Sequence, residues 1–271
     1  MAETDKVFAG SIPAIYDGLL VPMIFTYYAR DLAARVAQSN PSHVLETAAG
    51  TGALTRELAA RLPANAALTA TDLNQPMLDH NASTLRHDTR IFWRQADALA
   101  LPFDDQNFDA VACQFGAMFF PDRVRGYAEA RRVLKSQGRF IFNVWDRIEE
   151  NDFALVVTEA VAAMFPADPP RFFARTPHGY ADVARIRADL TAAGFGSIGI
   201  ETLATTSKAA SPRDVAVAFC QGTPLRNEIE ARDAARLEEA TQAAAEAVAR
   251  RFGSGAVEGR ISAHVITAVK R

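Results

Sequence analysis

The pattern of apolar and polar positions changes its period several times along the first half of the chain. Short apolar runs, typical of strands buried on both faces, alternate with stretches in which apolar residues recur at helical spacing. The predicted strands are 43–46, 67–73, 91–97, 108–115 and 139–145, and the predicted helices are 51–61, 75–86 and 124–134. This alternation predicts a parallel, doubly wound α/β sheet with right-handed crossovers.

The second half is less regular. It predicts helices at 152–165 and 180–193, a proline-rich aromatic loop at 166–177, a strand at 197–203, helices at 212–219 and 225–251, and a last strand at 261–269. The segment 8–28, which begins with Phe8 and is rich in aromatic residues, predicts an N-terminal helical cover.

A glycine turn follows the first strand. Gly50 and Gly52 allow a tight turn and close approach of a ligand to the backbone, and the next helix begins there with free N–H groups. In the dinucleotide-binding fingerprint a third glycine follows the second by three residues, but this chain has Thr55 at that position. The turn therefore indicates a nucleotide cofactor without saying which one.

Glu46, at the end of the first strand, narrows the choice of cofactor. A carboxylate here disfavours an anionic pyrophosphate and suits a ligand with a cationic ammonium group, such as S-adenosylmethionine. The structural alternative is that Glu46 caps the turn or pairs with a neighbouring arginine.

Composition sets outer limits on function. The 271 residues carry a net charge of −3 and a pI near 6.0, which argues against a dedicated nucleic-acid binder. Cys113 and Cys220 stand apart in apolar runs, which favours buried thiols, and no cluster has the spacing of metal ligands. With no signal peptide and no apolar run long enough to span a bilayer, we expect a cytoplasmic protein without membrane insertion.

Several motifs stand in one order along residues 40–145, and together they resemble class I S-adenosylmethionine-dependent methyltransferases, closest to the ubiquinone/menaquinone biosynthesis type. The resemblance implies a Rossmann-like fold with a seven-stranded, mainly parallel sheet whose last strand is antiparallel. The motifs are the glycine turn, Asp72, and residues 95–98, 101–103, 108–111 and 132–139.

Residue by residue, the resemblance implies how S-adenosyl-L-methionine is held. Glu46 would hold the methionine ammonium, and the turn residues would let the backbone approach the ligand. Asp72 would accept both ribose hydroxyls, although it also suits a helix N-cap. The implied turn residues are Ala48, Gly50, Thr51 and Gly52; many members have glycine where Ala48 stands.

The same resemblance assigns the adenine end. Leu73 and Met77 would press on the base, while the Asp97 carboxylate and the Ala98 N–H would read its edge. A turn-forming role is the alternative for Asp97. Three residues after the fourth strand, which would otherwise be core residues, are candidate walls of the site: Phe115, Gly116 and Met118.

The acceptor is expected to be a small molecule, because the chain lacks the Asn/Asp-Pro-Pro-aromatic signature of enzymes that methylate nucleic-acid amines. We expect the N-terminal cover and residues 150–180 to form an apolar pocket for an aromatic or lipophilic acceptor. Tyr16 and Tyr28 are candidates to reach the methionine carboxylate or the acceptor, or to serve in packing. By residue type alone, His178 and Tyr180 are weak candidates for a catalytic base, and His264 is expected to be structural.

The expected organisation is a single methyltransferase domain over 1–271, with an N-terminal cover at 1–40, a cofactor-binding core at 41–147 and substrate-side helices with the last two strands at 148–271. Two other functions remain open at this stage: an NAD(P)-dependent oxidoreductase and a cofactor-binding protein without catalysis. The acceptor, the methylated atom and the oligomeric state are not determined by the sequence.

Overall fold

The computed structural model describes residues 12–271, and this part of the chain forms two compact units. We call residues 26–144, 180–202 and 264–271 the core unit, and the remaining described residues, 12–25, 145–179 and 203–263, the helical unit. Strands β6 (Ser197–Ala209) and β7 (Val257–Val269) run through both units. Phe8 lies outside the described residues.

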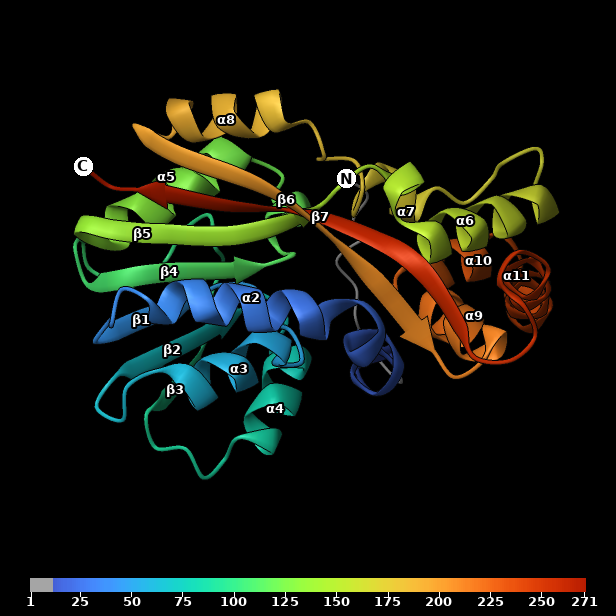
Figure 1. Ribbon diagram of the computed structural model, residues 1–271, viewed down its shortest axis with the longest axis horizontal. Helices are drawn as coiled ribbons and strands as arrows, with labels where there is room; N and C mark the ends of the chain where they lie inside the picture. Colours follow the sequence, from blue (N-terminus) through green and yellow to red (C-terminus); the bar gives the residue numbers. More distant parts are fainter. Residues whose placement is uncertain (1–11) are drawn as a thin grey trace. The chain divides into compact units, whose positions relative to one another are not determined.

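The core unit is built on a twisted sheet of order β3-β2-β1-β4-β5-β7-β6 (Figure 1). Hydrogen-bonded pairs β1–β2, β1–β4, β2–β3 and β4–β5 are all parallel, as the apolar runs predict. The strands are β1 (His43–Glu46), β2 (Ala67–Asp72), β3 (Ile91–Gln95), β4 (Phe108–Gln114) and β5 (Leu134–Trp145). The strand order reverses between β1 and β4, and ligands of such sheets bind at the carboxyl ends beside this reversal.

The last strand is antiparallel to its neighbour. Gln137 N donates to Lys270 O and Lys270 N donates to Gly138 O, while farther along β5 Asp146 N donates to Ser262 O. The partner numbers on β7 fall as those on β5 rise, so β7 runs against β5, as Figure 1 also shows. The predicted sheet is therefore confirmed, including its antiparallel last strand.

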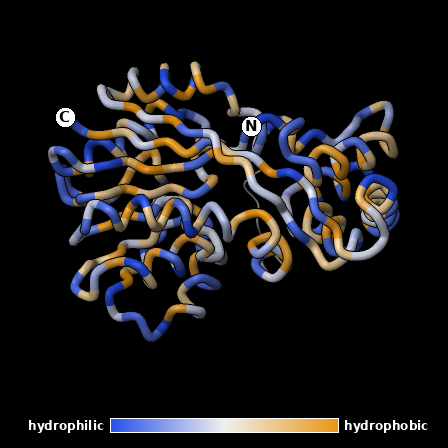
Figure 2. The backbone as a smooth tube through the Cα atoms, viewed as in Figure 1, coloured by the Kyte–Doolittle hydropathy of each residue, from blue (hydrophilic) through white to orange (hydrophobic). Residues whose placement is uncertain are grey.

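Five helices accompany the sheet of the core unit. α2 packs beside α3, and α5 packs on α8. Figure 2 shows the apolar colour concentrated in the strands, with polar residues on the outer sides of the helices. The helices are α2 (Thr26–Ala37), α3 (Ala53–Arg61), α4 (Gln75–Thr84), α5 (Arg123–Val133) and α8 (Val183–Ala192).

The helical unit contains α1 (Ile12–Ile15), a π-helical segment (Tyr16–Phe25) and five further α-helices. Within it, α11 packs on α9 and on α6, and the π-helical segment packs on α9. The remaining helices are α6 (Asp152–Met164), α7 (Phe172–Arg175), α9 (Pro212–Gln221), α10 (Leu225–Asp233) and α11 (Leu237–Phe252). None of the helices within residues 12–271 is long and apolar enough to cross a membrane.

Several expected elements are corrected. β6 and β7 are longer than the expected strands 197–203 and 261–269, and α7 lies within the expected loop 166–177. Residues 135–138, expected to be a turn before the strand 139–145, belong to β5, which begins at Leu134 and takes them in as an irregularity, with Gln137 at φ 63° and its N–H bonded to Lys270 O. The expected helix 225–251 is two helices, because the Asp233 side chain accepts from Ala235 N and starts a new turn. The described part of 8–28 is not one regular helix, since Pro22 lies within a π-helical segment.

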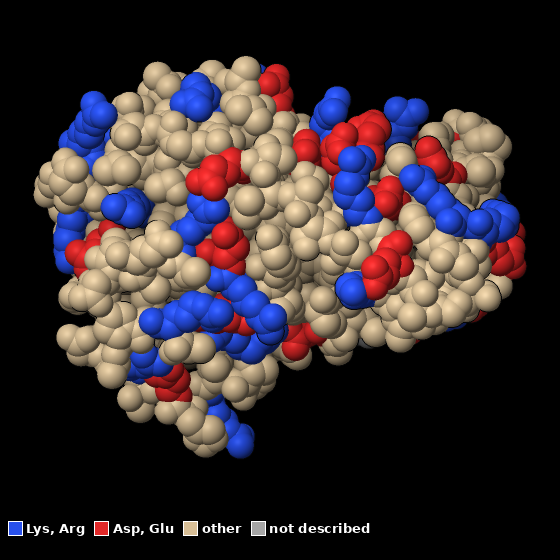
Figure 3. Space-filling view, in the orientation of Figure 1, with Lys and Arg blue, Asp and Glu red and all other residues tan. Residues whose placement is uncertain are grey.

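Two arginines of α2 are paired with carboxylates. Figure 3 shows a group of basic side chains over α2 and α3. Arg30 pairs with Glu57, and Arg35 pairs with both Asp31 and Glu201.

Candidate functional site

The chain leaves β1 through a turn with left-handed backbone conformations. Ala48, Gly50 and Gly52 have φ values of 53°, 55° and 94°. A Cβ built on Gly52 would lie 2.0 Å from Asn81 Oδ1, so only glycine fits there. Ala48 adopts a conformation that favours glycine, which explains why glycine is common at this position in the resembled family.

The residues after β4 pack closely against the same turn. Phe115 has φ 49°, and its N–H donates to Asn143 Oδ1 at 2.9 Å. A Cβ on the next residue, Gly116, would lie 2.4 Å from the Cβ of Ala48. The backbone at Gly116, after β4, is therefore in contact with the side chain of Ala48, after β1. This contact supports the strained backbone conformations of both segments.

Glu46 is buried directly before this turn, with only 1% of its surface exposed. Burial raises the pKa of its carboxyl to about 8, and a hydrogen bond from the Thr55 hydroxyl opposes that rise. Its Oε2 atom and the Thr51 hydroxyl are both buried without a hydrogen-bond partner within residues 12–271. Buried polar atoms are rarely left unpaired, so these two atoms point to a bound polar group at the turn.

Asp72 connects the turn to the end of β2. Its Oδ2 accepts from Gly50 N at 2.8 Å, and its Oδ1 accepts from Asn74 N at 2.7 Å. Burial raises the pKa of Asp72 above its ordinary value, and these backbone donors oppose the rise. Each carboxylate oxygen has a second lone pair, so Asp72 can shape the turn and still accept from ribose hydroxyls. The N-cap of α4 is Asn74 rather than Asp72.

The expected adenine-end residues lie at the ends of β2 and β3. Asp97 is exposed and its Oδ1 accepts from Leu99 N at 2.9 Å, so the turn-forming role is present. Leu73 is 46% exposed, which is unusual for leucine and leaves its side chain available to a base. Met77 is buried, with its Cε 3.8 Å from the position of a Cβ on Gly50. Ala98 is half-buried.

Met118 and Tyr28 are fully packed in the core unit. Met118 is 1% exposed, and Tyr28 is buried with its ring edge-on to Phe115 at 5.5 Å between centroids. Tyr28 therefore helps to hold Phe115 in its left-handed conformation, which is a packing role. The structure brings together Glu46, Ala48, Gly50, Thr51, Gly52, Asp72, Met77, Phe115 and Gly116 around the ends of β1, β2 and β4.

Sequence reasoning missed two residues behind Glu46. Asn81 Nδ2 donates to Thr55 Oγ1 at 2.8 Å, and both side chains are fully buried. The available signal was Thr55 itself, a polar residue where the dinucleotide fingerprint requires glycine. Its hydroxyl is hydrogen-bonded to the Glu46 carboxyl at the end of β1, and the dinucleotide fingerprint does not require a carboxyl at that position.

Other family-like motifs hold one another in place, away from the turn. Arg132 donates to the carbonyl oxygens of Leu101 and Phe103 at 2.8 and 2.7 Å. Asp109 accepts from Lys135 Nζ at 2.7 Å and from His43 N at 2.8 Å. These residues fix loops and strand starts, so their recurrence in the motif pattern has a structural cause.

The helical unit contains a row of aromatic rings from segments far apart in sequence. Ring centroids are 5.1 Å apart for Tyr16 and Phe25, 5.7 Å for Phe25 and Trp145, and 6.2 Å for Trp145 and His178. The N-terminal segment and the segment after β5 are thus joined within one unit. Phe25 and Trp145 are buried, so this row belongs to the packed interior of the helical unit.

His178 is a weak proton acceptor. Its Nδ1 lies 2.8 Å from the Asp146 carbonyl oxygen, which can only accept, so Nδ1 carries the proton and Nε2 keeps a lone pair. Burial lowers the pKa of His178 to about 4. The imidazole is neutral at pH 7, but its basicity is well below the optimum for general-base catalysis at that pH.

Tyr180 and His264 are tied into the core unit. The Tyr180 hydroxyl donates to Asp189 Oδ2 at 2.9 Å, and Arg123 lies over its ring. Burial raises the pKa of Tyr180 well above its usual range, so the geometry favours a structural role over proton transfer. His264 contacts Thr202 Oγ1 and the Ala181 carbonyl oxygen through its two ring nitrogens, which agrees with the expected structural role.

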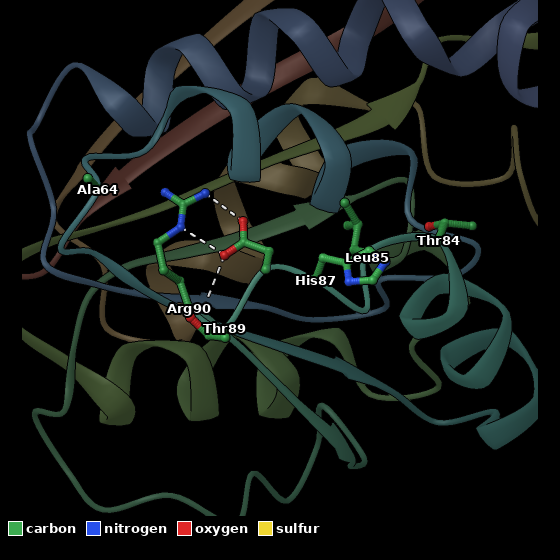
Figure 4. Close-up of a pocket in the computed structure, with 7 residues that line it drawn as sticks. Ala64, Thr84, Leu85, His87, Thr89 and Arg90 are labelled. Carbon is green, nitrogen blue, oxygen red and sulfur yellow. Dashed lines mark hydrogen bonds and ion pairs between the residues drawn. The ribbon is translucent and has the colours of Figure 1, made fainter.

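Figure 4 shows a hollow on the core unit. It is lined by Ala64 and six residues between 84 and 90, which precede β2 and β3 and so lie at the amino ends of these strands. Arg90 pairs with Asp88 and donates to the carbonyl oxygens of Ala59, Leu62 and Pro63, at the end of α3. This loop therefore caps a helix. Within residues 12–271 no group of three or more His, Cys, Asp or Glu side chains is arranged to hold a metal ion.

The sequence of this chain is similar to those of known methyltransferases. Residues 44–138 match the family described as a methyltransferase domain. The ubiquinone/menaquinone biosynthesis C-methyltransferase of Citrifermentans bemidjiense is 32% identical over 145 residues, covering 51% of this chain and 62% of the relative. The demethylmenaquinone methyltransferase of Clavibacter sepedonicus is 39% identical over 106 residues, covering 39% and 42%. The chain thus spans about three fifths or less of the length of these relatives.

Comparison of structures supports the fold over more of the chain. A Bacillus halodurans protein, provisionally identified as a methyltransferase, matches with a TM-score of 0.59 and 18% identity, covering 89% of this chain and 98% of that protein. At this identity the match shows a shared fold and nothing finer. The sequence match covers the cofactor side of the core unit, and the fold match extends beyond it.

Proposed function

We propose, from the premise that residues 44–138 are a class I S-adenosylmethionine-dependent methyltransferase domain, that the chain methylates a small-molecule acceptor. The observation that carries this proposal is the buried Glu46 carboxyl, whose Oε2 has no partner within the described chain, beside a left-handed glycine turn. A dinucleotide pyrophosphate would meet an acid there, whereas a cationic amine would find a matching partner.

The residues around the turn fit the expected cofactor. When bound, S-adenosyl-L-methionine supplies an electrophilic methyl group on a sulfonium. Glu46 would hold the ammonium group, and Asp72 would accept from the ribose hydroxyls with lone pairs not used by the turn. Leu73 and Met77 would cover the adenine, and Asp97 with Ala98 N would read its edge.

For the chain's own residues, the main catalytic task is positioning. An activated methyl donor needs an acceptor atom in line and a site without water, and these two conditions supply a large part of the rate. Neither candidate base suits strong general-base catalysis, because His178 is too weak a base and Tyr180 is held in a structural network. We therefore propose that acceptors that ionise easily, such as phenols or quinols, react fastest.

The proposed acceptor is aromatic or lipophilic. The aromatic composition of the helical unit, where Tyr16, Phe25, Trp145 and His178 pack together, supports an aromatic acceptor. One relative is named a ubiquinone/menaquinone biosynthesis C-methyltransferase and the other a demethylmenaquinone methyltransferase, which supports methylation of a ring carbon of a quinol-like molecule. A nucleic-acid acceptor is disfavoured by the net charge of −3 and by the paired arginines over α2 and α3.

We also propose a cytoplasmic location. The two cysteines of the chain, Cys113 and Cys220, are buried free thiols. Burial raises the pKa of the Cys113 thiol to about 11, so this thiol is unreactive and suited to a reducing compartment.

Methyl transfer tests the proposal directly. The purified chain would be incubated with S-adenosylmethionine carrying a labelled methyl group and a panel of quinols, simple phenols, amines and carboxylic acids. We expect label in a quinol or phenol, attached to carbon or oxygen as mass spectrometry would show. Label only in charged aliphatic acceptors would refute the aromatic acceptor, and tight cofactor binding with no transfer to any class would favour a cofactor-binding protein without catalysis.

A further inference from the structure

Behind the glycine turn, three buried side chains from three elements form a hydrogen-bonded series. Asn81 on α4 donates from Nδ2 to Thr55 Oγ1 at 2.8 Å, and the Thr55 hydroxyl on α3 donates to the carboxyl of Glu46 at the end of β1. All three are at least 99% buried.

The Thr55 hydroxyl links Asn81 to Glu46. Asn81 donates to the Thr55 oxygen, which leaves the single hydroxyl hydrogen of Thr55 free for the Glu46 carboxyl. The Asn81 Oδ1 atom lies 2.0 Å from the position of a Cβ on Gly52 and is buried without a hydrogen-bond partner within residues 12–271. One oxygen of the Glu46 carboxyl is thus hydrogen-bonded to Thr55, while Oε2 has no partner within residues 12–271.

The groups facing Glu46 do not balance its charge. Asp72 on β2 disfavours the ionised form of Glu46, and Arg56 on α3 favours it weakly. The nearby Cys113 on β4 is a neutral thiol, and Glu46 helps to raise its pKa. Burial dominates, so the carboxyl keeps its proton near neutral pH when no cation faces it. A carboxylic acid is a poor partner for an ammonium group, and binding of that group requires the carboxylate.

We propose that Thr55 and Asn81 are positioning residues that set the ionisation of Glu46, and that binding of the donor's ammonium group releases a proton from Glu46. This inference rests on the proposed function, because it takes the amino-acid end of S-adenosylmethionine as the ligand of Glu46. Affinity is then limited by the fraction of protein in which Glu46 is ionised.

Calorimetric titration between pH 6 and pH 8 tests the proposal with two ligands. S-adenosylhomocysteine carries the amino-acid group, and 5′-methylthioadenosine shares the adenosine but lacks that group. With a carboxyl pKa of about 8, the ionised fraction rises about 50-fold from pH 6 to pH 8. We expect the affinity for S-adenosylhomocysteine to rise by up to this factor, with proton release that shows as a dependence of the binding heat on the buffer. The affinity for 5′-methylthioadenosine should stay nearly constant.

Three variants separate this role from a loss of structure. Thr55→Val removes the hydroxyl that serves the carboxylate and should move the pH profile upward, weakening S-adenosylhomocysteine about tenfold at pH 7 if the pKa rises by about one unit. Thr55→Ser should restore the profile. Thr71→Val is the matched control, because the buried Thr71 hydroxyl donates to the backbone oxygen of Glu46 and not to its carboxyl.

The outcomes are distinct. A pH-independent affinity for S-adenosylhomocysteine, or the same profile in Thr55→Val and wild type, overturns this inference and leaves the proposed function standing. If neither adenosine ligand binds at any pH, the proposed function fails and the inference fails with it.

Discussion

The buried Glu46 carboxyl affects folding stability and ligand binding in opposite directions as pH rises. A carboxyl with a pKa of about 8, against an ordinary value of 4.5, is protonated in the folded protein over a range where it is ionised in the unfolded chain. The folded state therefore binds more protons between these pH values, and the contribution of Glu46 to stability falls as pH rises through this window. The same carboxyl is the group that a cationic ligand needs.

Glu46→Gln should therefore gain stability relative to wild type at high pH and lose ligand affinity. Between pH 5 and pH 8.5 we expect the difference in unfolding free energy to shift in favour of the variant by on the order of 3 kcal/mol. Denaturant unfolding at the two pH values measures the shift. The exposed Glu159→Gln is a control that should show no such change. Equal pH dependence in Glu46→Gln and wild type would contradict the raised pKa.

Single residues also show the limits of sequence reasoning. Glu46, Asp72 and the turn glycines were expected from their places at strand ends, and the structure brings them together. Asn81 could not be expected, because its contact with Thr55 joins two helices and depends on how closely α4 approaches Gly52. Tyr180 was a candidate by residue type, but its partners Asp189 and Arg123 are visible only in the fold.

Among the elements, the contact between the β1 turn and the end of β4 holds the site together. Gly116→Ala should push the new Cβ into that of Ala48, since neither group can swing aside. We expect a loss of about 1–3 kcal/mol in unfolding free energy and a weaker affinity for S-adenosylhomocysteine. Thermal unfolding and calorimetry would measure the two effects.

Gly199→Ala is the matched control in the same unit, because its Cβ would have only an ordinary contact with Thr267 O at 3.9 Å. This variant should change stability by less than about 0.5 kcal/mol. If both variants behave alike, the contact between Gly116 and Ala48 is not a constraint on the turn.

The loop before β3 is expected to matter for stability alone. Arg90→Ala removes the guanidinium that caps α3 and pairs with Asp88, and we expect a loss of about 1–2 kcal/mol. The affinity for S-adenosylhomocysteine should be unchanged, because the hollow lined by this loop is at the amino ends of the strands. The exposed Arg86→Ala serves as control. Loss of cofactor affinity in Arg90→Ala alone would show that the hollow belongs to the site.

Element boundaries were predictable where the local pattern decides them. β1, β2, β4 and the helices α3, α5 and α6 lie within one or two residues of their expected positions, since apolar period and turn residues specify them. The predicted start of β5, residue 139, was wrong. Hydrogen bonding with Lys270, more than 130 residues away, keeps the polar residues 135–138 in the sheet. Such pairing leaves no local signal.

At the scale of the whole molecule, the chain divides its proposed tasks between two units. All expected cofactor residues except Tyr16 lie in the core unit, and the row of aromatic rings lies in the helical unit. The sequence predicted the α/β class and the sheet because strands and helices alternate with a regular period. The composition of the helical unit from residues 12–25, 145–179 and 203–263 could not be predicted, because it depends on contacts between distant segments.

We propose that the turn after β1 holds S-adenosylmethionine. Calorimetric titration of the chain with S-adenosylhomocysteine and with NADH, repeated on Asp72→Ala, tests this assignment. We expect binding of S-adenosylhomocysteine at one site per chain, no binding of NADH, and a loss of affinity of at least about tenfold in a folded Asp72→Ala variant. Tight binding of NADH without S-adenosylhomocysteine, or full affinity in Asp72→Ala, would contradict it.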